Sequence, residues 1–234
     1  MERQQPDHKE IYSRYAEQYD RLVSCSDYQQ NILRALNEIR ALDQADVVEL
    51  GAGTGRLTCK LAPVVKSIHS FDASHHMLAV AVSKLEKSGL KNWRAGVADN
   101  RDLPLDAQVA DIVIAGWSIC YTVLWHEDRW REELNKALAE IKRVLRPRGT
   151  IILLESLGTG YQTPRPPRSL GMYYEFLRDM GFLSTLIRTD YCFESLEEAE
   201  MLVRFFFGTD KVEKVVNEST ITLPEYTGIW WLSV

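Results

Sequence analysis

The chain has 234 residues, 45% of them hydrophobic, and a formal net charge of -5. This size and composition are typical of one globular domain with a single core. The acidic balance argues against a surface built to hold a phosphate backbone, so we expect no nucleic-acid partner. No run of about 18 apolar residues occurs and the opening residues lack a secretory apolar region, so we expect a cytoplasmic protein without membrane contact.

The cysteine and histidine pattern indicates neither disulfides nor a metal. Cys25, Cys59, Cys120 and Cys192 are scattered without a Cys-x-x-Cys pair. They are interpreted as reduced thiols that fill packing positions. The adjacent pair at 75–76 (HH) opens a predicted helix and has no third ligand nearby, so no metal site is predicted.

Strands and helices alternate along the first two thirds of the chain. An amphipathic helix is predicted over residues 29–42, where apolar residues recur every three or four positions. The elements that follow are a strand at 46–50, a helix at 56–65, a strand at 67–71, a helix from about 74, strands at 93–97 and 110–115, a helix at 127–145 and a strand at 150–154. The last strand, TIILL, lacks polar alternation and is predicted to be covered on both faces.

The C-terminal third has a different pattern. It is predicted to contain a proline-rich loop at 163–168, a helix at 170–180, a strand at 183–192, a helical segment at 196–216 and a last strand at 227–234. The apolar run 201–207 (MLVRFFF) packs either a helical flap or a dimer surface. The alternation as a whole predicts an α/β fold with a doubly wound sheet, in which ligands lie at the carboxyl ends of the strands.

Residues 47–56 (VVELGAGTGR) place three glycines directly after a strand, which lets the backbone approach a ligand closely. The dinucleotide fingerprint requires a glycine where Arg56 stands, and a phosphate loop requires a Gly-Lys-Ser/Thr that is absent. Glu49, two residues before the first glycine, would repel a pyrophosphate. A ligand with a cationic or hydrogen-donating portion therefore fits better.

This stretch and the pieces after it resemble the class I S-adenosylmethionine-dependent methyltransferases, over roughly residues 44–156. The residues 49–55 (ELGAGTG) resemble the family's first motif, in which the loop wraps the methionine part of the cofactor. The residues 71–78 (FDASHHML) resemble the second, in which the acid grips both ribose hydroxyls, a role that the resemblance gives to Asp72. Ser74 is predicted to cap the helix that follows.

Three further pieces extend the resemblance. The residues 99–104 (DNRDLP) resemble the segment whose acid accepts a hydrogen bond from the adenine amino group, which places Asp99 and Asn100 on the adenine edge. The stretches 111–117 (DIVIAGW) and 143–155 (RVLRPRGTIILLE) match the remaining pieces, although Arg148 stands where the family often has glycine. The cofactor-binding residues that the resemblance implies are Tyr19, Glu49, Gly51, Ala52, Gly53, Gly55, Asp72, Ala73, Met77, Asp99, Asn100, Gly116 and Trp117.

The resemblance also implies the remaining architecture: a single Rossmann-like domain with a mostly parallel seven-stranded sheet, an antiparallel C-terminal strand and helical lid elements. Residues 1–44 are expected to form an N-terminal helical lid, 45–156 the cofactor-binding core, and 157–234 the acceptor-side insertions and last strands. The cofactor is S-adenosyl-L-methionine, its product S-adenosyl-L-homocysteine, and no metal takes part.

Because the sulfonium methyl is already activated, the protein has to hold acceptor, methyl carbon and sulfur in line. A general base is needed only for an acceptor that carries a proton with a high pKa. The candidate catalytic residues are His126, Tyr121 and Tyr15; for His126 the alternative is an exposed residue at a helix start. Trp117 and Tyr121 offer ring faces to a sulfonium or an amine, or else they fill the core.

The N-terminal residues 12–22 (YSRYAEQYDRL) resemble the opening of small-molecule members of the family, where this segment forms a lid. Tyr12, Tyr15 and Tyr19 are three and four residues apart, so they share one helical face that is either pocket or core. The candidate acceptor contacts are Tyr12, Trp117, Tyr121, Trp125, Tyr161, Arg165, Arg168 and Tyr173. An arginine there would pair with a carboxylate or phosphate, or else be a solvated loop charge.

The sequence thus predicts a monomeric or homodimeric methyltransferase that acts on an oxygen, nitrogen or carbon nucleophile of a small molecule by in-line displacement. The alternatives are a methyltransferase directed at RNA or protein, and a catalytically silent cofactor-binding regulatory module. A nicotinamide oxidoreductase is a third alternative, against which Arg56 counts.

Overall fold

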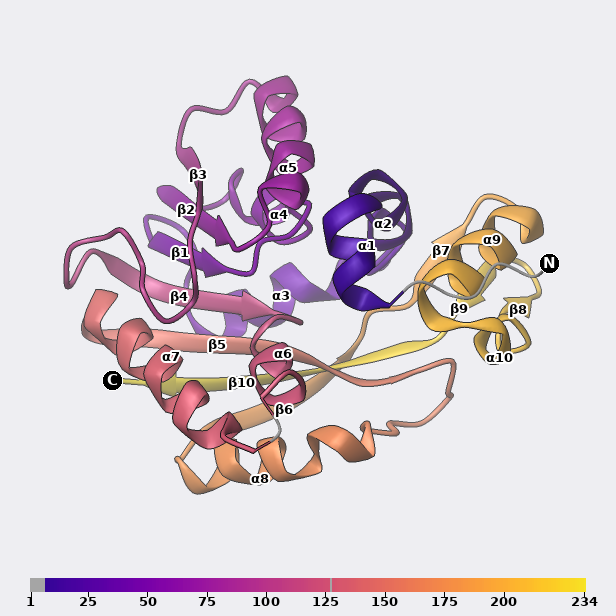
Figure 1. Ribbon diagram of the computed structural model, residues 1–234. Coiled ribbons are helices and arrows are strands. Elements are labelled where there is room, and N and C mark those ends of the chain that lie inside the picture. Colours follow the sequence, from indigo (N-terminus) through magenta and orange to yellow (C-terminus); the bar gives the residue numbers. More distant parts are fainter. Residues whose placement is uncertain (1–6, 127) are drawn as a thin grey trace.

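The computed structural model describes residues 7–126 and 128–234, which fold around a seven-stranded sheet of order β3-β2-β1-β4-β5-β10-β6 (Figure 1). Its strands are β1 (Asp46–Leu50), β2 (Ser67–Asp72), β3 (Trp93–Val97), β4 (Ala110–Gly116), β5 (Leu145–Thr159), β6 (Leu183–Arg188) and β10 (Glu225–Ser233). Strands β1 to β5 pair in parallel, and β10 runs antiparallel to both β5 and β6. The predicted doubly wound, mostly parallel sheet with an antiparallel C-terminal strand is therefore confirmed.

The order of the strands reverses at β1, which pairs with β2 on one side and with β4 on the other. In open α/β sheets the loops on the two sides of such a reversal diverge and leave a crevice at the carboxyl ends of the strands. The fold thus fixes where a ligand binds before any side chain is considered.

Helices cover both faces of the sheet. One face packs against α3 (Asn31–Ile39), α4 (Thr58–Leu61) and α5 (His75–Ser88), and the other against α6 (Ile119–Leu124), α7 (Trp130–Val144) and α8 (Gly171–Asp179), which follows the short 3-10 helix η1 (Arg168–Leu170). In β5, Ile151 and Leu153 join one apolar cluster and Ile152 and Leu154 join the other, and all four are fully buried. The TIILL stretch is covered on both faces, as predicted.

A small lobe beside the sheet departs from the sequence expectations. The strand expected at 183–192 is divided into β6 and β7 (Tyr191–Phe193), which belong to different sheets. The helical segment expected at 196–216 breaks at Gly208, where φ is +90°, into α9 (Leu196–Phe207) and α10 (Thr209–Val212). Its end becomes β8 (Val216–Asn217), which pairs with β9 (Ile221–Leu223) in a three-stranded sheet with β7.

Other helices differ from the sequence expectations only in where they begin and end. The helix expected at 56–65 is limited to α4, and the helix expected at 127–145 is α7, with residue 127 outside the described residues. Within the apolar run 201–207, Leu202 and Val203 are buried against Leu22 and Leu223, so this part of the run packs the lobe itself.

The N-terminal helices α1 (His8–Arg14) and α2 (Ala16–Ser24) bridge the sheet and the lobe (Figure 1). Helix α2 contributes Leu22 to the apolar cluster of the lobe, and α1 and α2 both contact α5. Residues of both helices lie beside the carboxyl ends of the strands, since Tyr12 of α1 and Tyr19 of α2 line the same cavity as Gly51 and Asp72.

Trp230 of β10 tests the packing of the sheet against α8. Its ring stacks on Tyr174 with 4.7 Å between centroids, and Trp230 is buried. We expect Trp230→Ala to lower the free energy of unfolding by about 3–5 kcal/mol because it leaves a large cavity. Urea denaturation measures this, with Leu186→Ala on the exposed face of β6 as the control and an expected change within about 0.5 kcal/mol. Equal losses for both variants would contradict the packing described.

Candidate functional site

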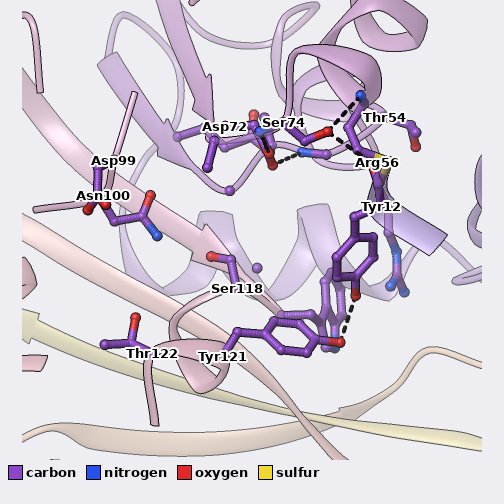
Figure 2. A pocket seen from close by; sticks show the side chains of 18 of the residues that line it. Tyr12, Thr54, Arg56, Asp72, Ser74, Asp99, Asn100, Ser118, Tyr121 and Thr122 are labelled. Atoms are coloured by element: carbon purple, nitrogen blue, oxygen red, sulfur yellow. Dashed lines mark hydrogen bonds between the residues drawn. The ribbon is translucent and has the colours of Figure 1, made fainter. Parts of the chain in front are cut away.

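A cavity of about 520 Å³ opens at the carboxyl ends of the parallel strands (Figure 2). Four strand ends supply its wall, because Gly51 follows β1, Asp72 ends β2, Asp99 lies two residues after β3 and Gly116 ends β4. The residues singled out from the sequence that line it are Tyr12, Tyr19, Glu49, Gly51, Ala52, Gly53, Asp72, Ala73, Met77, Asp99, Asn100, Gly116, Trp117, Tyr121, Trp125 and His126.

The first and third glycines are fixed by close packing. A Cβ on Gly51 would lie 2.2 Å from Cβ of Ser118, which follows β4 and donates its hydroxyl to the Leu50 carbonyl. A Cβ on Gly55 would lie 3.1 Å from Cβ of Ala81 in α5. Both glycines have positive φ, +64° and +83°, which also favours glycine. Gly55 does not line the cavity, so its role is helix packing rather than contact with a ligand.

Asp72 ties the glycine loop to the start of α5. Its Oδ2 accepts a hydrogen bond from the Gly53 amide at 2.8 Å, and its Oδ1 accepts one from the Ser74 amide at 2.7 Å (Figure 2). Burial raises the pKa of this carboxyl, and the two backbone donors oppose that change. A carboxylate has about four acceptor positions, so two remain for a ligand. Ser74 caps α5 by accepting from the Met77 amide, as predicted.

Asp99 is already paired. Its two oxygens accept from Nε and Nη2 of Arg101 at 2.7 and 2.6 Å, and Arg101 also pairs with Glu133 of α7. These partners lower the pKa of Asp99, mainly through the hydrogen bond from Arg101. The sequence had not indicated Arg101, which anchors this edge of the cavity to α7. Asn100 lies beside it in the wall (Figure 2).

Glu49 lines the cavity and is 2% exposed. Its Oε2 accepts hydrogen bonds from the hydroxyls of Thr58 and Ser70. Burial raises its pKa to about 7, because the charged form is the one that burial disfavours. Glu49 therefore braces the start of α4 against β2, and the charge repulsion expected from it is weakened by protonation.

Arg56 and Trp117 form a stacked pair in the wall. The guanidinium carbon lies 3.6 Å from the centroid of the indole ring, and both residues line the cavity. One face of Trp117 is therefore occupied, which leaves a single face for any sulfonium or amine. Nε and Nη2 of Arg56 are buried without a hydrogen-bond partner among the described residues. Buried donors without an acceptor are costly, so these two nitrogens are suited to an anionic ligand group.

Aromatic side chains close the cavity on the side of the N-terminal helices. The Tyr12 hydroxyl of α1 donates to the Tyr121 hydroxyl of α6 at 2.6 Å (Figure 2), and the Tyr121 hydroxyl lies 3.1 Å from Nδ1 of His8. Burial lowers the pKa of His8, which favours a neutral ring that accepts from Tyr121. Nδ1 of His126 lies 3.1 Å from the Thr122 carbonyl, so a proton on Nδ1 leaves Nε2 as an acceptor.

Besides Gly55, five predicted residues lie outside this cavity. Tyr15 is 39% exposed and does not line the cavity, because its backbone ends α1 and α2 restarts at the next residue, which turns Tyr15 out of the face shared by Tyr12 and Tyr19. Tyr173 is fully buried, and its hydroxyl donates to Glu155 in the core, so an acceptor cannot reach it. Tyr161, Arg165 and Arg168 line a separate cavity beyond the end of β5.

Some wall residues were missed by the sequence analysis. They are Lys9, Ser13, Thr54, Arg56, Leu57, Ser74, Arg101, Ser118 and Thr122. Thr54 and Arg56 stand within or directly after the glycine motif, which was the available signal for them. Lys9 and Ser13 have no motif that would single them out; their place follows from how α1 packs on the sheet.

The comparisons with known proteins agree with this geometry. The sequence profile described as "Methyltransferase domain" matches residues 48–153. The uncharacterized protein YafE of Escherichia coli (strain K12) is 30% identical over 156 residues, which are 65% of this chain and 68% of that one. The chain belongs to the class I S-adenosylmethionine-dependent methyltransferases. It is therefore an enzyme that uses S-adenosylmethionine.

Two further methyltransferases are similar to this chain. A malonyl-[acyl-carrier protein] O-methyltransferase of Marinomonas sp. (strain MWYL1) is 32% identical over 146 residues, which cover 60% of this chain and only 48% of that protein. The solved structure of a SAM-dependent methyltransferase from Aquifex aeolicus has a TM-score of 0.56 at 18% identity and covers 97% of this chain and 94% of its own. The second likeness concerns the fold alone.

Residues 7–126 and 128–234 contain neither a metal-binding cluster of side chains nor a helix suited to span a membrane. No group of three or more His, Cys, Asp or Glu side chains in these ranges is placed to hold a metal ion. No helix in the same ranges is long and apolar enough to cross a membrane.

The raised pKa of Glu49, about 7, predicts a pH dependence of stability. Between the ordinary pKa of a glutamate and 7, the unfolded chain has lost this proton and the folded chain keeps it. The contribution of Glu49 to the free energy of unfolding is thus largest at acidic pH. It declines by about 1.4 kcal/mol per pH unit between the ordinary pKa of a glutamate and 7. Denaturant titrations of wild type and Glu49→Gln from pH 4.5 to 8 should show the smaller decline in the variant. Parallel curves would contradict a protonated Glu49.

The Tyr12–Tyr121 hydrogen bond predicts how firmly the N-terminal helices are held. Tyr12→Phe removes it and keeps the ring, at a cost of about 1 kcal/mol. Amide hydrogen exchange of α1 should speed up by about fivefold if this bond resists local opening. Tyr28→Phe, at an exposed tyrosine, is the matched control and should leave exchange unchanged. Unaltered exchange of α1 in Tyr12→Phe would show that this hydrogen bond does not hold the N-terminal helices in place.

Proposed function

We propose that this chain transfers the methyl group of S-adenosylmethionine to an oxygen, nitrogen or carbon nucleophile of a small molecule by in-line displacement. The observation that carries the proposal is the convergence of the loops after β1, β2, β3 and β4 on one cavity, with Gly51, Asp72 and Asp99 in its wall. These are the positions whose motifs resemble the family's methionine, ribose and adenine contacts. The domain division into lid, core and acceptor-side insertions is part of the same proposal.

The wall of the cavity offers suitable partners for the methionine and ribose parts of the cofactor. A Cβ on Gly53 would meet only Cε of Met77 at 3.6 Å and a ring atom of Tyr19 at 4.0 Å, so the loop leaves room for a ligand against its backbone. Two acceptor positions of Asp72 remain for the ribose hydroxyls. Nε and Nη2 of Arg56, which have no hydrogen-bond partner in the part of the chain that the structure describes, suit the carboxylate of the methionine part.

Asp99 and Asn100 are proposed to hold the adenine. Asp99 keeps its bond to Arg101 and uses a remaining lone pair toward the adenine amino group, while the Asn100 amide serves the ring. Arg101 keeps this carboxylate ionised and fixed through Glu133. The adenosyl part would then be held by two carboxylates on neighbouring strand ends.

The bound cofactor supplies an electrophilic methyl group, and the residues of the chain position the acceptor and exclude water. Tyr12 and Tyr121 close the cavity from the lid side, and Trp117 and Trp125 supply apolar ring surface. Removal of water strengthens the electrostatic contacts within the site. The enclosure by aromatic side chains favours a small acceptor over a macromolecular one.

Two proton acceptors are available for an acceptor that must lose a proton. His126 lines the cavity and has Nε2 free when Nδ1 donates to Thr122. The Tyr12 hydroxyl can accept a proton if its own proton moves to the Tyr121 hydroxyl and the Tyr121 proton moves to Nδ1 of His8, because these groups are hydrogen-bonded in that order. His8 does not itself line the cavity, so it acts only through the hydrogen bonds that connect it to Tyr121 and Tyr12.

The role of Asp72 is testable by binding. We expect Asp72→Ala to weaken S-adenosylmethionine and S-adenosylhomocysteine at least about tenfold, because two charge-assisted hydrogen bonds to the ribose are lost. Isothermal titration calorimetry measures both affinities. Asp179→Ala, at an exposed acid of α8, keeps the same charge change and should bind as wild type does.

Asp72→Asn keeps one acceptor oxygen, so it retains one of the two backbone hydrogen bonds and loses the other. Cofactor affinity and thermal midpoint are both expected to lie between those of wild type and Asp72→Ala. Wild-type affinity in both Asp72 variants would show that another group holds the ribose.

A further inference from the structure

A second cavity, of about 690 Å³, lies beyond the carboxyl end of β5, between the loop 160–168 and the helices α9 and α10. Its wall shares no residue with that of the cofactor cavity. Three cationic side chains, Arg165, Arg168 and Lys211, line it together with Tyr161. In a chain whose net charge is -5, this is a local concentration of positive charge.

The positive charges of this cavity are almost unpaired. Within residues 7–126 and 128–234, no carboxylate forms an ion pair with Arg165 or Arg168. Lys211 lies 3.9 Å from a carboxylate oxygen of Asp210, whose side chain is 79% exposed. Cations held close together without acids repel one another, so an anion between them is favoured.

Two of the cations, those of Arg165 and Lys211, lie against the ring of Tyr161. The Arg165 guanidinium carbon lies 4.7 Å and the Lys211 ammonium 4.6 Å from the centroid of its ring. The Lys211 ammonium also donates to the Tyr161 hydroxyl at 3.3 Å. These neighbours lower the pKa of the Tyr161 phenol, mainly through the hydrogen bond from Lys211. The electrostatic potential at the ring is thus strongly positive.

The backbone around the cavity is fixed. Gly158 has a φ of +122°, and a Cβ there would lie 2.7 Å from the Arg165 carbonyl oxygen. The Arg165 amide donates to the Leu157 carbonyl at 2.6 Å. A Cβ on Gly160 would lie 2.8 Å from Cβ of Lys214, just after α10. The loop that carries Arg165 is therefore packed onto β5, and α10 with Lys211 is packed onto the loop.

We propose that this second cavity is a phosphoryl-binding site, in which Arg165, Arg168 and Lys211 hold the oxygens of a phosphate monoester or of free phosphate. One arginine guanidinium can donate two parallel hydrogen bonds to two phosphate oxygens, and a lysine ammonium adds a compact positive charge. A dianion neutralises more of this charge than a single carboxylate does. The Tyr161 hydroxyl lies beside Lys211 as a further polar contact.

The site is tested by calorimetric titration of the full chain with inorganic phosphate and with phenyl phosphate, with sodium chloride holding the ionic strength constant. Saturable binding is expected. Arg165→Gln and Lys211→Gln should each weaken it by about tenfold, as expected for the loss of one charge-assisted contact. Arg178→Gln, at an exposed arginine of α8, is the matched control and should bind phosphate as wild type does.

A spectroscopic signature separates a filled site from general charge screening. Phosphate bound beside Tyr161 disfavours the phenolate, so the pH midpoint of its ¹³Cζ resonance, assigned with Tyr161→Phe, should rise on saturation. Tighter binding of phenyl phosphate identifies a phosphorylated small molecule as the source, and equal binding identifies free phosphate; both outcomes support the site.

Three results would overturn this assignment. Absence of saturable binding, or equal affinity in Arg165→Gln and wild type, would remove the site. Malonate binding as tightly as phosphate would contradict the phosphoryl class. Arg165→Gln and Lys211→Gln should bind S-adenosylhomocysteine as tightly as wild type does, because neither residue lines the first cavity. The phosphate result therefore tests the second cavity separately from the function proposed for the first.

Discussion

The site depends on one carboxylate that joins two strand ends. Asp72, at the end of β2, accepts from the amides of Gly53 in the glycine loop and Ser74 at the start of α5. Together with the hydrogen bond from the Ala52 amide to the Phe71 carbonyl, this bridge fixes two loops that come from different strands at the point where they meet. The same carboxylate retains acceptor capacity toward the cavity. The feature that shapes the loops therefore also presents the group proposed to hold the ribose.

Buried acids give the strand ends a rigid base. Glu49 holds Thr58 and Ser70, Glu155 of β5 accepts from the Cys120 amide and the Tyr173 hydroxyl, and Glu225 accepts from Ser156. Burial raises the pKa of each of the three acids to about 7. Because neutral acids cost less to bury than charged ones, burial favours the protonated form of all three acids, and the nearby Arg56 partly opposes this at Glu225.

The sequence was most informative where local pattern and topology agree. Strand β1 and the glycines after it form one contiguous signal, and Asp72 and Asp99 follow strands whose parallel order brings their ends together. The antiparallel last strand followed from the family resemblance. Convergence of distant residues on one cavity was predictable because the fold class fixes which edge of the sheet they share.

The predictions that failed depended on details that no periodicity encodes. Tyr15 was placed with Tyr12 and Tyr19 on one helical face, but the backbone breaks at Tyr15 itself. Tyr173 was predicted to contact the acceptor, whereas α8 turns its ring into the core.

The length of β5 explains why Tyr161, Arg165 and Arg168 do not reach the cavity where they were expected. This strand continues to Thr159, five residues beyond the predicted end at 154, and carries Tyr161 and both arginines away from the cofactor cavity. Nothing in the sequence linked His8 to Tyr121, since that contact depends on the docking of α1.

The central claim is that the loops at positions 51, 72 and 99 hold one adenosyl cofactor. A crystal structure of the chain with S-adenosylhomocysteine tests it most directly. The account predicts the ribose hydroxyls on Asp72, the adenine beside Asp99 and Asn100, and the amino-acid end along the glycine loop and Arg56. A cofactor bound at any other surface, or bound here with its ribose away from Asp72, would contradict it.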